Sequence, residues 1–162
     1  MHIKIISTGG TIDKIYFDAK SNYTVGDPLI GEILAHAGVN FTFDVEKLMA
    51  KDSLELTNED RRLIVDRVGS DPCPRIIVTH GTDTMIDTAR ALEAVEGKTI
   101  VLVGSLSPAR FKGTDAEFNI GFAVAAVQTL PHGSYVAMQG RAYRPDEVRK
   151  NVEANRFEEI EK

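Results

Sequence analysis

The sequence predicts an α/β fold in which a mainly parallel sheet lies between two layers of helices. Short runs rich in β-branched residues alternate along the chain with longer stretches whose apolar residues recur at helical spacing. The clearest unit is residues 75–90, RIIVTHGTDTMIDTAR, where a continuous apolar run precedes a turn and a helix. Continuous apolarity is typical of a strand buried on both faces. We therefore expect right-handed crossovers and a three-layer sandwich of the Rossmann or flavodoxin-like kind.

The other elements follow from the same two patterns. We expect strands at residues 2–6, 41–45, 76–78, 99–103 and 135–138, and helices at residues 29–37, 57–68 and 117–130, with a further helix that contains residues 85–95. Thr57 should cap its helix, and Thr84 with Asp87 fits a capping box. The intervening and terminal segments are expected to be loops at residues 16–28, 48–53 and 104–115, and a solvated helix or frayed tail at residues 146–162.

Size and charge narrow the class of function. A chain of 162 residues with 43% apolar content suits one domain, so we expect a single domain over residues 1–162. A net charge of -5 argues against a nucleic-acid groove or an anionic membrane surface, because both need concentrated Lys and Arg. No apolar run approaches the length of a membrane span. A small-molecule substrate is therefore the expected partner.

Motifs for metals and cofactors are missing from the sequence. No two of the four histidines are four residues apart, as a metal-binding pair on a helix would be, and no cysteine is grouped with them. We therefore expect no zinc site. Neither a dinucleotide-binding nor a P-loop glycine motif occurs, and we expect no cofactor. Cys73 is the only cysteine, which excludes an internal disulfide and favours a reducing compartment, with the cytoplasm as our expectation.

Two polar turns contain the candidate residues for catalysis and binding. Gly10 and Thr11 follow the first strand directly, and Gly81, Thr82 and Asp83 follow the strand at residues 76–78. Ligands of open α/β sheets bind at this edge, and glycine turns bring N–H groups close to them. The alternatives are an ordinary turn for the first segment and helix capping for the second. If the two strands are neighbours, the threonine hydroxyls and the aspartate should share a cleft.

That cleft would suit acyl transfer. A threonine hydroxyl becomes a nucleophile when a nearby base takes its proton, and turn amides can hold an oxyanion. Tyr23 lies in the long segment at residues 16–28 and is the natural candidate to reach in, although the residues alone favour a surface anchor that packs this segment down. Lys150 would have catalytic use if it lies near Thr82 and Asp83.

Two motifs carry a resemblance to a known family. Residues 7–12, STGGTI, and residues 79–85, THGTDTM, resemble the two signatures of bacterial-type L-asparaginases. Residues 21–26, SNYTVG, look like the mobile active-site loop of that family, and Glu147 to Lys150 falls where the family carries its lysine. The resemblance covers nearly the whole chain but only the amino-terminal domain of the family, so we expect the carboxy-terminal domain to be absent.

The resemblance implies hydrolysis of the side-chain amide of asparagine, and of glutamine in many members. Thr11 would be the nucleophile, with Tyr23 beside it, while Thr82, Asp83 and Lys150 would form the second catalytic group. The expected substrate-binding residues are Gly10, Lys51, Asp52, Gly81 and Asp83, and Asp83 would hold the substrate ammonium. A domain separated from a two-domain architecture retains apolar surface, which favours a homo-oligomer.

Two alternatives to this asparaginase hypothesis follow from two departures: the expected absence of the carboxy-terminal domain and a change at residues 50–52. Where the family usually has a serine and a polar residue to hold the substrate carboxylate, we align Ala50, Lys51 and Asp52. Lys51 could supply a charge for that carboxylate, or it could be a solvated surface lysine. The chain could therefore be a weak or inactive asparaginase-like domain that binds a small amino acid or a partner subunit, or an amidase for a different acidic amide.

Overall fold

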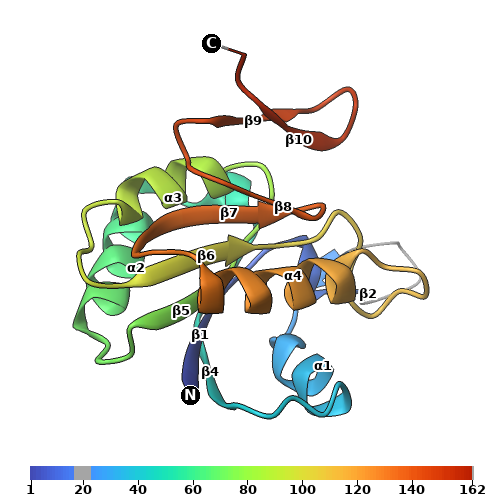
Figure 1. Cartoon of the computed structure of the whole chain (residues 1–162). Helices are drawn as coiled ribbons and strands as arrows, with labels where there is room; N and C mark the ends of the chain where they lie inside the picture. The colour runs from blue at the N-terminus through green and yellow to red at the C-terminus, as the bar shows by residue number, and fades with distance from the viewer. Residues whose placement is uncertain (17–22, 162) are drawn as a thin grey trace.

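The computed structural model describes residues 1–16 and 23–161 and contains a central six-stranded sheet (Figure 1). The strand order is β4-β1-β5-β6-β7-β8, and all neighbours run parallel except β7 and β8. The strands are β1 (His2–Gly9), β4 (Thr42–Lys51), β5 (Arg75–Thr79), β6 (Thr99–Val103), β7 (Gly133–Met138) and β8 (Arg141–Tyr143). The mainly parallel sheet of the sequence prediction is confirmed.

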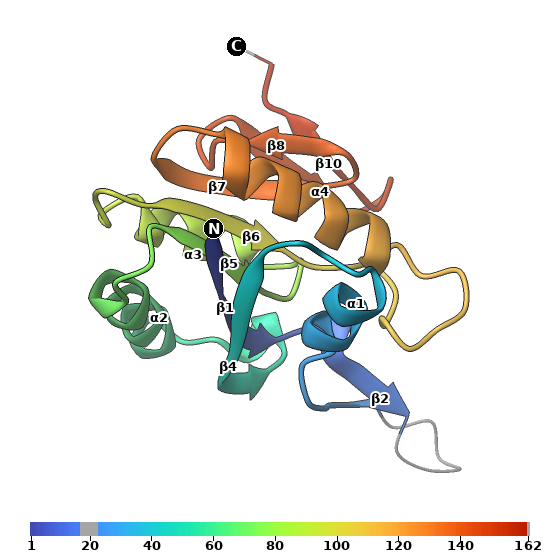
Figure 2. The same cartoon turned by 60° about the horizontal axis from the view of Figure 1, so that its bottom comes forward.

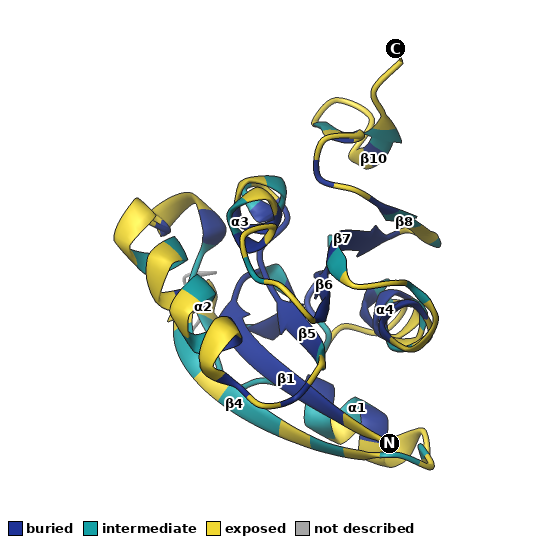
Figure 3. Cartoon of the chain, turned by 60° about the vertical axis from the view of Figure 1, so that its left-hand side comes forward, coloured by how far each residue is buried: buried dark blue, intermediate teal, exposed yellow. Residues whose placement is uncertain are grey.

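Helices cover both faces of this sheet. One face carries α1 (Ile30–His36) and α4 (Ala116–Thr129), and the other carries α2 (Asn58–Ser70) and α3 (Met85–Leu92) (Figure 3). Successive strand residues point to opposite faces and so divide between two cores. In β5, Ile77 packs with α1 and α4, whereas Ile76 and Val78 pack with α2 and α3. The three-layer sandwich is therefore also confirmed.

Two small hairpins and two short turns complete the fold. The hairpins pair β2 (Lys14–Tyr16) with β3 (Tyr23–Val25), and β9 (Val148–Asn151) with β10 (Arg156–Glu159). The 3₁₀ turns are η1 (Thr11–Asp13) and η2 (Ser53–Glu55). Figure 2 shows α1 close to β4 at one edge of the sheet, and the end of the chain beyond β8 at the other edge. Among the described residues, neither hairpin pairs as a strand with the central sheet.

Three segment predictions were wrong. Residues 146–162 contain the β9–β10 hairpin instead of a helix or frayed tail, because the hairpin buries Val148 and Phe157 in the α2–α3 core. Strand β4 continues through the expected loop at residues 48–53 as far as Lys51, which pairs with Gly9 of β1. The expected loop at residues 16–28 includes strand β3, and its residues 17–22 lie outside the described residues.

One of the two cap predictions is confirmed. The Thr57 hydroxyl accepts the Asp60 N–H, and the Asp60 carboxylate accepts the Thr57 N–H, so both halves of a capping box are present. Thr84 makes no such box with Asp87, because the Thr84 hydroxyl donates instead to the Ser53 carbonyl at 2.7 Å. Thr84 thus joins the start of α3 to η2.

Within residues 1–16 and 23–161, no helix combines the length and apolarity needed to cross a membrane.

The capping box predicts the stability of one variant. Thr57→Ala removes the hydroxyl that accepts the Asp60 N–H and should lower the free energy of unfolding by about 1 kcal/mol. Thr57→Ser keeps that acceptor and should unfold close to the parent. Urea denaturation of the three proteins checks this, and equal midpoints for the alanine variant and the parent would contradict it.

Candidate active site

The two polar turns meet at the carboxyl edge of the sheet. Strands β1 and β5 are parallel neighbours, with Ser7 opposite Thr79. A Cβ added to Gly10 would lie 2.3 Å from the Gly81 nitrogen, so the backbones of the two turns are in direct contact. Gly10 also has φ 89, a conformation that favours glycine. The predicted adjacency of the first strand and the strand at residues 76–78 is confirmed.

Hydrogen bonds join the first turn to the second. The Thr8 hydroxyl donates to the Thr79 carbonyl at 2.8 Å, and the His80 N–H donates to the Val103 carbonyl at 2.9 Å. The peptide after Gly10 then enters η1, where Thr11 is half-buried at the first position. Thr11 is therefore held at the point where β1, β5 and β6 end.

His80 fixes the backbone just before Thr82. Its ring is fully buried, its Nδ1 lies 2.8 Å from the Gly81 carbonyl, and its Nε2 lies 2.8 Å from the Thr88 hydroxyl. A carbonyl can only accept, so Nδ1 carries the proton and Thr88 donates to Nε2. Burial disfavours the imidazolium and lowers the pKa of His80 to about 4, which keeps the ring neutral near pH 7. We assign His80 a structural role in the turn.

Lys150 reaches the second turn from a segment distant in sequence. Its ammonium donates to the Thr82 hydroxyl at 2.9 Å and to the Asp83 carboxylate at 2.5 Å. Thr82 is 6% exposed, whereas Asp83 is exposed. Asp83 and Lys150 both line a groove between α3 and the β9–β10 hairpin. The structure therefore brings Thr82, Asp83 and Lys150 together, as the sequence analysis expected for a catalytic group.

Tyr23 begins strand β3 on the hairpin that follows η1. Its side chain is 48% exposed, and its ring centroid lies 6.2 Å from that of Phe111. The hairpin is tied to the first turn, because the Gly26 N–H donates to the Asp13 carbonyl at 2.7 Å. Tyr23 is thus carried by a segment anchored close to Thr11.

Lys51 and Asp52 are each held by another charged side chain. Both carboxylate oxygens of Asp60 accept from the Lys51 ammonium at 2.8 Å. Asp52 forms an ion pair with Lys14 at 2.6 Å, and the bond from Lys14 lowers the pKa of Asp52. For Lys51 to contact a substrate carboxylate, it would first have to leave Asp60. Its role in substrate binding stays a prediction.

Ser53 is a polar residue beside the site that the sequence analysis did not select. It is buried, and its hydroxyl has no hydrogen-bond partner among the described residues. A Cβ on Gly81 would lie 2.6 Å from the Ser53 hydroxyl oxygen, which places Ser53 against the second turn. Buried hydroxyls are normally paired, so an unpaired one beside this turn is available to a ligand.

Asp13 is a second residue that the sequence analysis missed. It is 2% exposed, and its carboxylate accepts from the Ser7 hydroxyl at 3.0 Å and from the Leu29 N–H at 3.2 Å. Burial raises the pKa of Asp13 to about 6, although these two bonds and the charges of Lys47 and Arg110 oppose the rise. Asp13 thus ties η1 to β1 and to the start of α1. Only its burial after folding distinguishes it from a surface aspartate.

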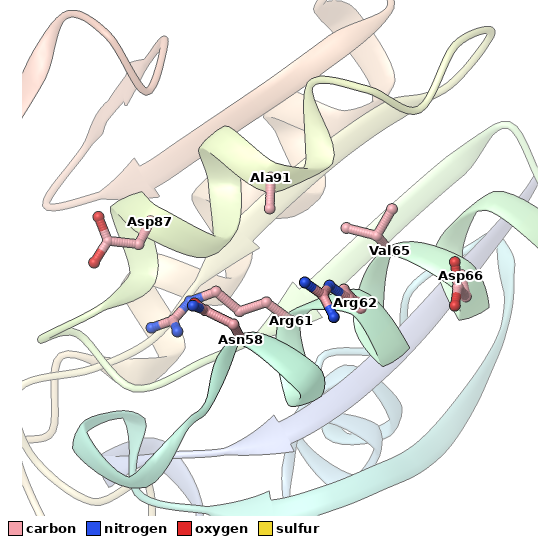
Figure 4. A pocket seen from close by; sticks show the side chains of 7 residues that line it. All are labelled: Asn58, Arg61, Arg62, Val65, Asp66, Asp87 and Ala91. Carbon is pink, nitrogen blue, oxygen red and sulfur yellow. The ribbon is translucent and has the colours of Figure 1, made fainter.

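A separate hollow lies between α2 and α3 (Figure 4). Arg61 and Arg62 extend into it, with Asp66 and Asp87 at its margins. The two positive charges are thus matched by two negative ones, and none of the residues predicted for catalysis lines this hollow. Among residues 1–16 and 23–161, no group of three or more His, Cys, Asp or Glu side chains gathers as metal ligands.

The fold and the site define an α/β protein whose candidate active site joins two threonine turns and a lysine at the sheet edge. The chain belongs to the asparaginase family: residues 2–161 match the family model described as "Asparaginase, N-terminal". It is 32% identical over 134 residues to L-asparaginase 2 of Escherichia coli (strain K12), with 76% of this chain covered. It is 31% identical over 135 residues to a glutaminase-asparaginase of Pseudomonas fluorescens biotype A, again with 76% of this chain covered.

A solved structure supports the same assignment. The thermostable L-asparaginase from Thermococcus kodakarensis superposes with a TM-score of 0.81 and 26% identity, covering 99% of this chain and 51% of that one. The matches cover 38% of the E. coli relative and 37% of the P. fluorescens relative. The chain therefore spans well under half the length of these curated relatives.

The pKa of Asp13 predicts how one substitution depends on pH. The folded pKa of about 6 exceeds the ordinary 3.8, so folding binds a proton to this carboxyl. Its stabilising contribution is complete below pH 3.8 and is lost as the pH rises to about 6. Asp13→Asn removes the titration, so its stability relative to the parent should increase by about 2 kcal/mol between pH 4 and pH 7.

Urea denaturation of the parent and Asp13→Asn at several pH values measures that difference. Comparing the two proteins at each pH cancels the titration of all other groups. Asp27, an exposed aspartate whose pKa is lowered by the bond from Lys47, offers a control in Asp27→Asn with the opposite sign. A stability difference for Asp13→Asn that stays constant from pH 4 to pH 7 would contradict the assignment.

Proposed function

We propose that this chain is an amide hydrolase that releases ammonia from the side-chain amide of L-asparagine, with L-glutamine as a second substrate. One observation carries the proposal: the Lys150 ammonium contacts both Thr82 and Asp83, beside the turn that presents Thr11. The names of the relatives, L-asparaginase and glutaminase-asparaginase, agree with it. We further propose that residues 1–162 act as one catalytic domain, since the two cores lie on the two faces of one sheet and together draw on residues from Ile3 to Phe157.

In the first half of the proposed reaction, Thr11 is the nucleophile. Its Oγ1 attacks the side-chain carbonyl carbon of asparagine, a C–O bond forms, and the carbonyl oxygen takes the negative charge. We assign stabilisation of this oxyanion to backbone N–H groups of the two glycine turns other than that of Gly10, which already donates to the Lys51 carbonyl at 2.9 Å. The C–N bond then breaks, and the Thr11 proton ends on the nitrogen, which leaves as ammonia. We assign the relay of that proton to the hydroxyl of Tyr23.

In the second half, water hydrolyses the ester on Thr11. The Thr82 hydroxyl accepts a proton from the attacking water and passes its own proton to Lys150, which must be neutral at that moment. The Asp83 carboxylate then stabilises the resulting ammonium at 2.5 Å. The ester bond to Thr11 breaks, the Thr11 hydroxyl is restored, and aspartate leaves as the carboxylate. Lys150 then gives its added proton to the released ammonia or to solvent, which makes it neutral for the next turnover. The sum is asparagine and water converted to aspartate and ammonium.

Substrate binding needs groups for the amino-acid end of asparagine. Asp83 is exposed enough to meet the substrate ammonium as well as Lys150. The unpaired Ser53 hydroxyl can donate to the substrate carboxylate, and it needs no existing bond to break, unlike Lys51. We therefore propose Ser53 as a carboxylate contact and keep Lys51 and Asp52 as predicted residues near the same end.

The nucleophile assignment predicts a large loss of activity. Thr11→Ala should reduce ammonia release from asparagine by about 10³-fold or more, because covalent catalysis becomes impossible. Thr129→Ala is a matched control: Thr129 lies at the end of α4, and among the described residues its hydroxyl bonds only to the Ala125 carbonyl of its own helix. A coupled ammonia assay measures both variants, and a Thr11→Ala rate close to that of the parent would refute the assignment.

The Ser53 assignment predicts an effect on binding alone. Ser53→Ala removes a buried hydroxyl that has no partner within residues 1–16 and 23–161, so its stability should equal or exceed that of the parent. Its KM for asparagine should rise about fivefold to tenfold, since one neutral hydrogen bond to a charged group is lost, while kcat changes little. Steady-state kinetics with thermal denaturation checks both parts. An unchanged KM would contradict the proposal that Ser53 contacts the substrate carboxylate.

A rival reading of the same site is an inactive domain that binds a small amino acid. Calorimetry with aspartate, run beside the ammonia assay on the same preparation, separates the two. Aspartate binding without any ammonia release from asparagine or glutamine would favour the binding domain over the enzyme.

A further inference from the structure

Gln139 has a backbone conformation that its residue type seldom adopts. It has φ 53 and is followed by Gly140 with φ 80, in the two-residue turn between β7 and β8. Turns with two positive φ values favour Asn-Gly or Gly-Gly, because other side chains are strained there. A glutamine at this position is unfavourable for the turn itself, which suggests that its side chain has another use.

The side chain of Gln139 holds the β9–β10 hairpin. Its Oε1 accepts the Phe157 N–H at 3.0 Å, and its Nε2 donates to the Asn155 carbonyl at 3.3 Å. One side-chain amide thus forms hydrogen bonds both to β10 and to the turn before it. An asparagine would suit the β7–β8 turn better, but it is one methylene shorter and would not span the same gap.

The backbone of Gln139 is in turn anchored to the main body. Its N–H donates to the Asn119 Oδ1 at 3.0 Å. Asn119 is fully buried in α4, and its Nδ2 donates to the Gly104 carbonyl at 3.0 Å and to Asp115 at 2.9 Å. The turn is therefore fixed to the loop that follows β6, at the same edge of the sheet as the candidate active site.

The bond from Gln139 to β10 fixes the strand that lies beside the catalytic lysine. Phe157 is the residue opposite Lys150 in the β9–β10 pairing. Both backbone groups of Phe157 are occupied from the main body, the N–H by Gln139 and the carbonyl by the Tyr143 hydroxyl at 3.2 Å. The hairpin has no strand pairing with the central sheet and projects from it, as Figure 1 shows, so these side-chain bonds, together with the burial of Val148 and Phe157, hold the strand that carries Lys150.

We propose that Gln139 is a positioning residue whose side-chain amide holds the β9–β10 hairpin through its bonds to Phe157 and Asn155, an interaction that we call the clasp. The clasp places the Lys150 ammonium against Thr82 and Asp83. The inference rests on the proposed function, because it gives Lys150 a part in catalysis. Gln139 itself touches no reacting atom. Its effect on turnover passes through Phe157 and the strand pairing to Lys150.

Gln139→Asn separates the turn from the clasp. It keeps, and should improve, the β7–β8 turn, so the variant should fold with a midpoint at or above that of the parent. Hydrogen exchange at the Phe157 amide should be about threefold to tenfold faster, since one hydrogen bond is lost. Because Lys150 is then less well placed, kcat should fall about tenfold with KM close to that of the parent.

Gln128→Asn is the matched control. Gln128 is the other glutamine of the chain and is exposed on α4. Within the part of the chain that the structure describes, its side chain bonds only to the Val124 carbonyl of its own helix. It should leave both Phe157 exchange and kcat unchanged. Phe157 exchange in Gln139→Asn equal to that of the parent would overturn the clasp. Faster exchange with unchanged kcat would overturn its role in positioning Lys150.

The exchange measurement and the ¹⁵N chemical shift of the Lys150 ammonium do not depend on activity. If the parent releases no ammonia, the proposed function fails, yet these two signals still report the clasp. A shift of the Lys150 signal in Gln139→Asn, absent in Gln128→Asn, supports it. An unmoved Lys150 signal contradicts it.

Discussion

The close contact between Gly10 and Gly81 is the constraint on which the candidate site depends. No side chain fits at either position: a Cβ on Gly10 would meet the Gly81 backbone, and a Cβ on Gly81 would meet Ser53. Parallel pairing of β1 with β5 brings these two turns to the same height, and the bond from Thr8 to Thr79 holds them there. The turns that carry Thr11 and Thr82 are in contact because the two glycines leave no layer of side chains between their backbones.

The remaining groups reach this contact from separate elements. Asp13 ties the first turn to β1 and α1, while Thr84 ties the second turn to η2. Lys150 comes from a hairpin that is attached through buried Val148 and Phe157 and through the amide of Gln139. A central sheet thus fixes the backbone of the site, and peripheral segments supply its charged groups. That division explains why positioning contacts matter more for Lys150 than for the threonines.

Much of the fold could be predicted from local pattern. The continuous apolar run at residues 76–78, the glycine turn after it and the helical spacing beyond it describe β5 and α3 well. The Thr57 cap could also be predicted from the sequence, because a capping box lies within four consecutive residues. The β9–β10 hairpin was missed because most of its residues are charged and exposed, and only Val148 and Phe157 mark its buried side.

The candidate site, like the fold, could be predicted only in part from the sequence. Thr11, Thr82 and Asp83 could be selected because glycine turns after buried strands are recognisable, and Lys150 because the family resemblance marked its position. Ser53 and Asp13 could not be selected, since an unpaired hydroxyl and a raised pKa arise only from tertiary burial. Similarly, the pairing of Lys51 with Asp60 requires knowing that β4 continues to Lys51 and ends beside α2.

The central claim is that Thr11 and Thr82 act on one and the same amide group. A crystal structure of the chain with aspartate, the product of the proposed reaction, tests it most directly. The account predicts that the side-chain carboxylate of aspartate lies within hydrogen-bond distance of both threonine hydroxyls, with its ammonium at Asp83. Aspartate bound elsewhere, or a bound carboxylate that only one of the two hydroxyls can reach, would contradict it.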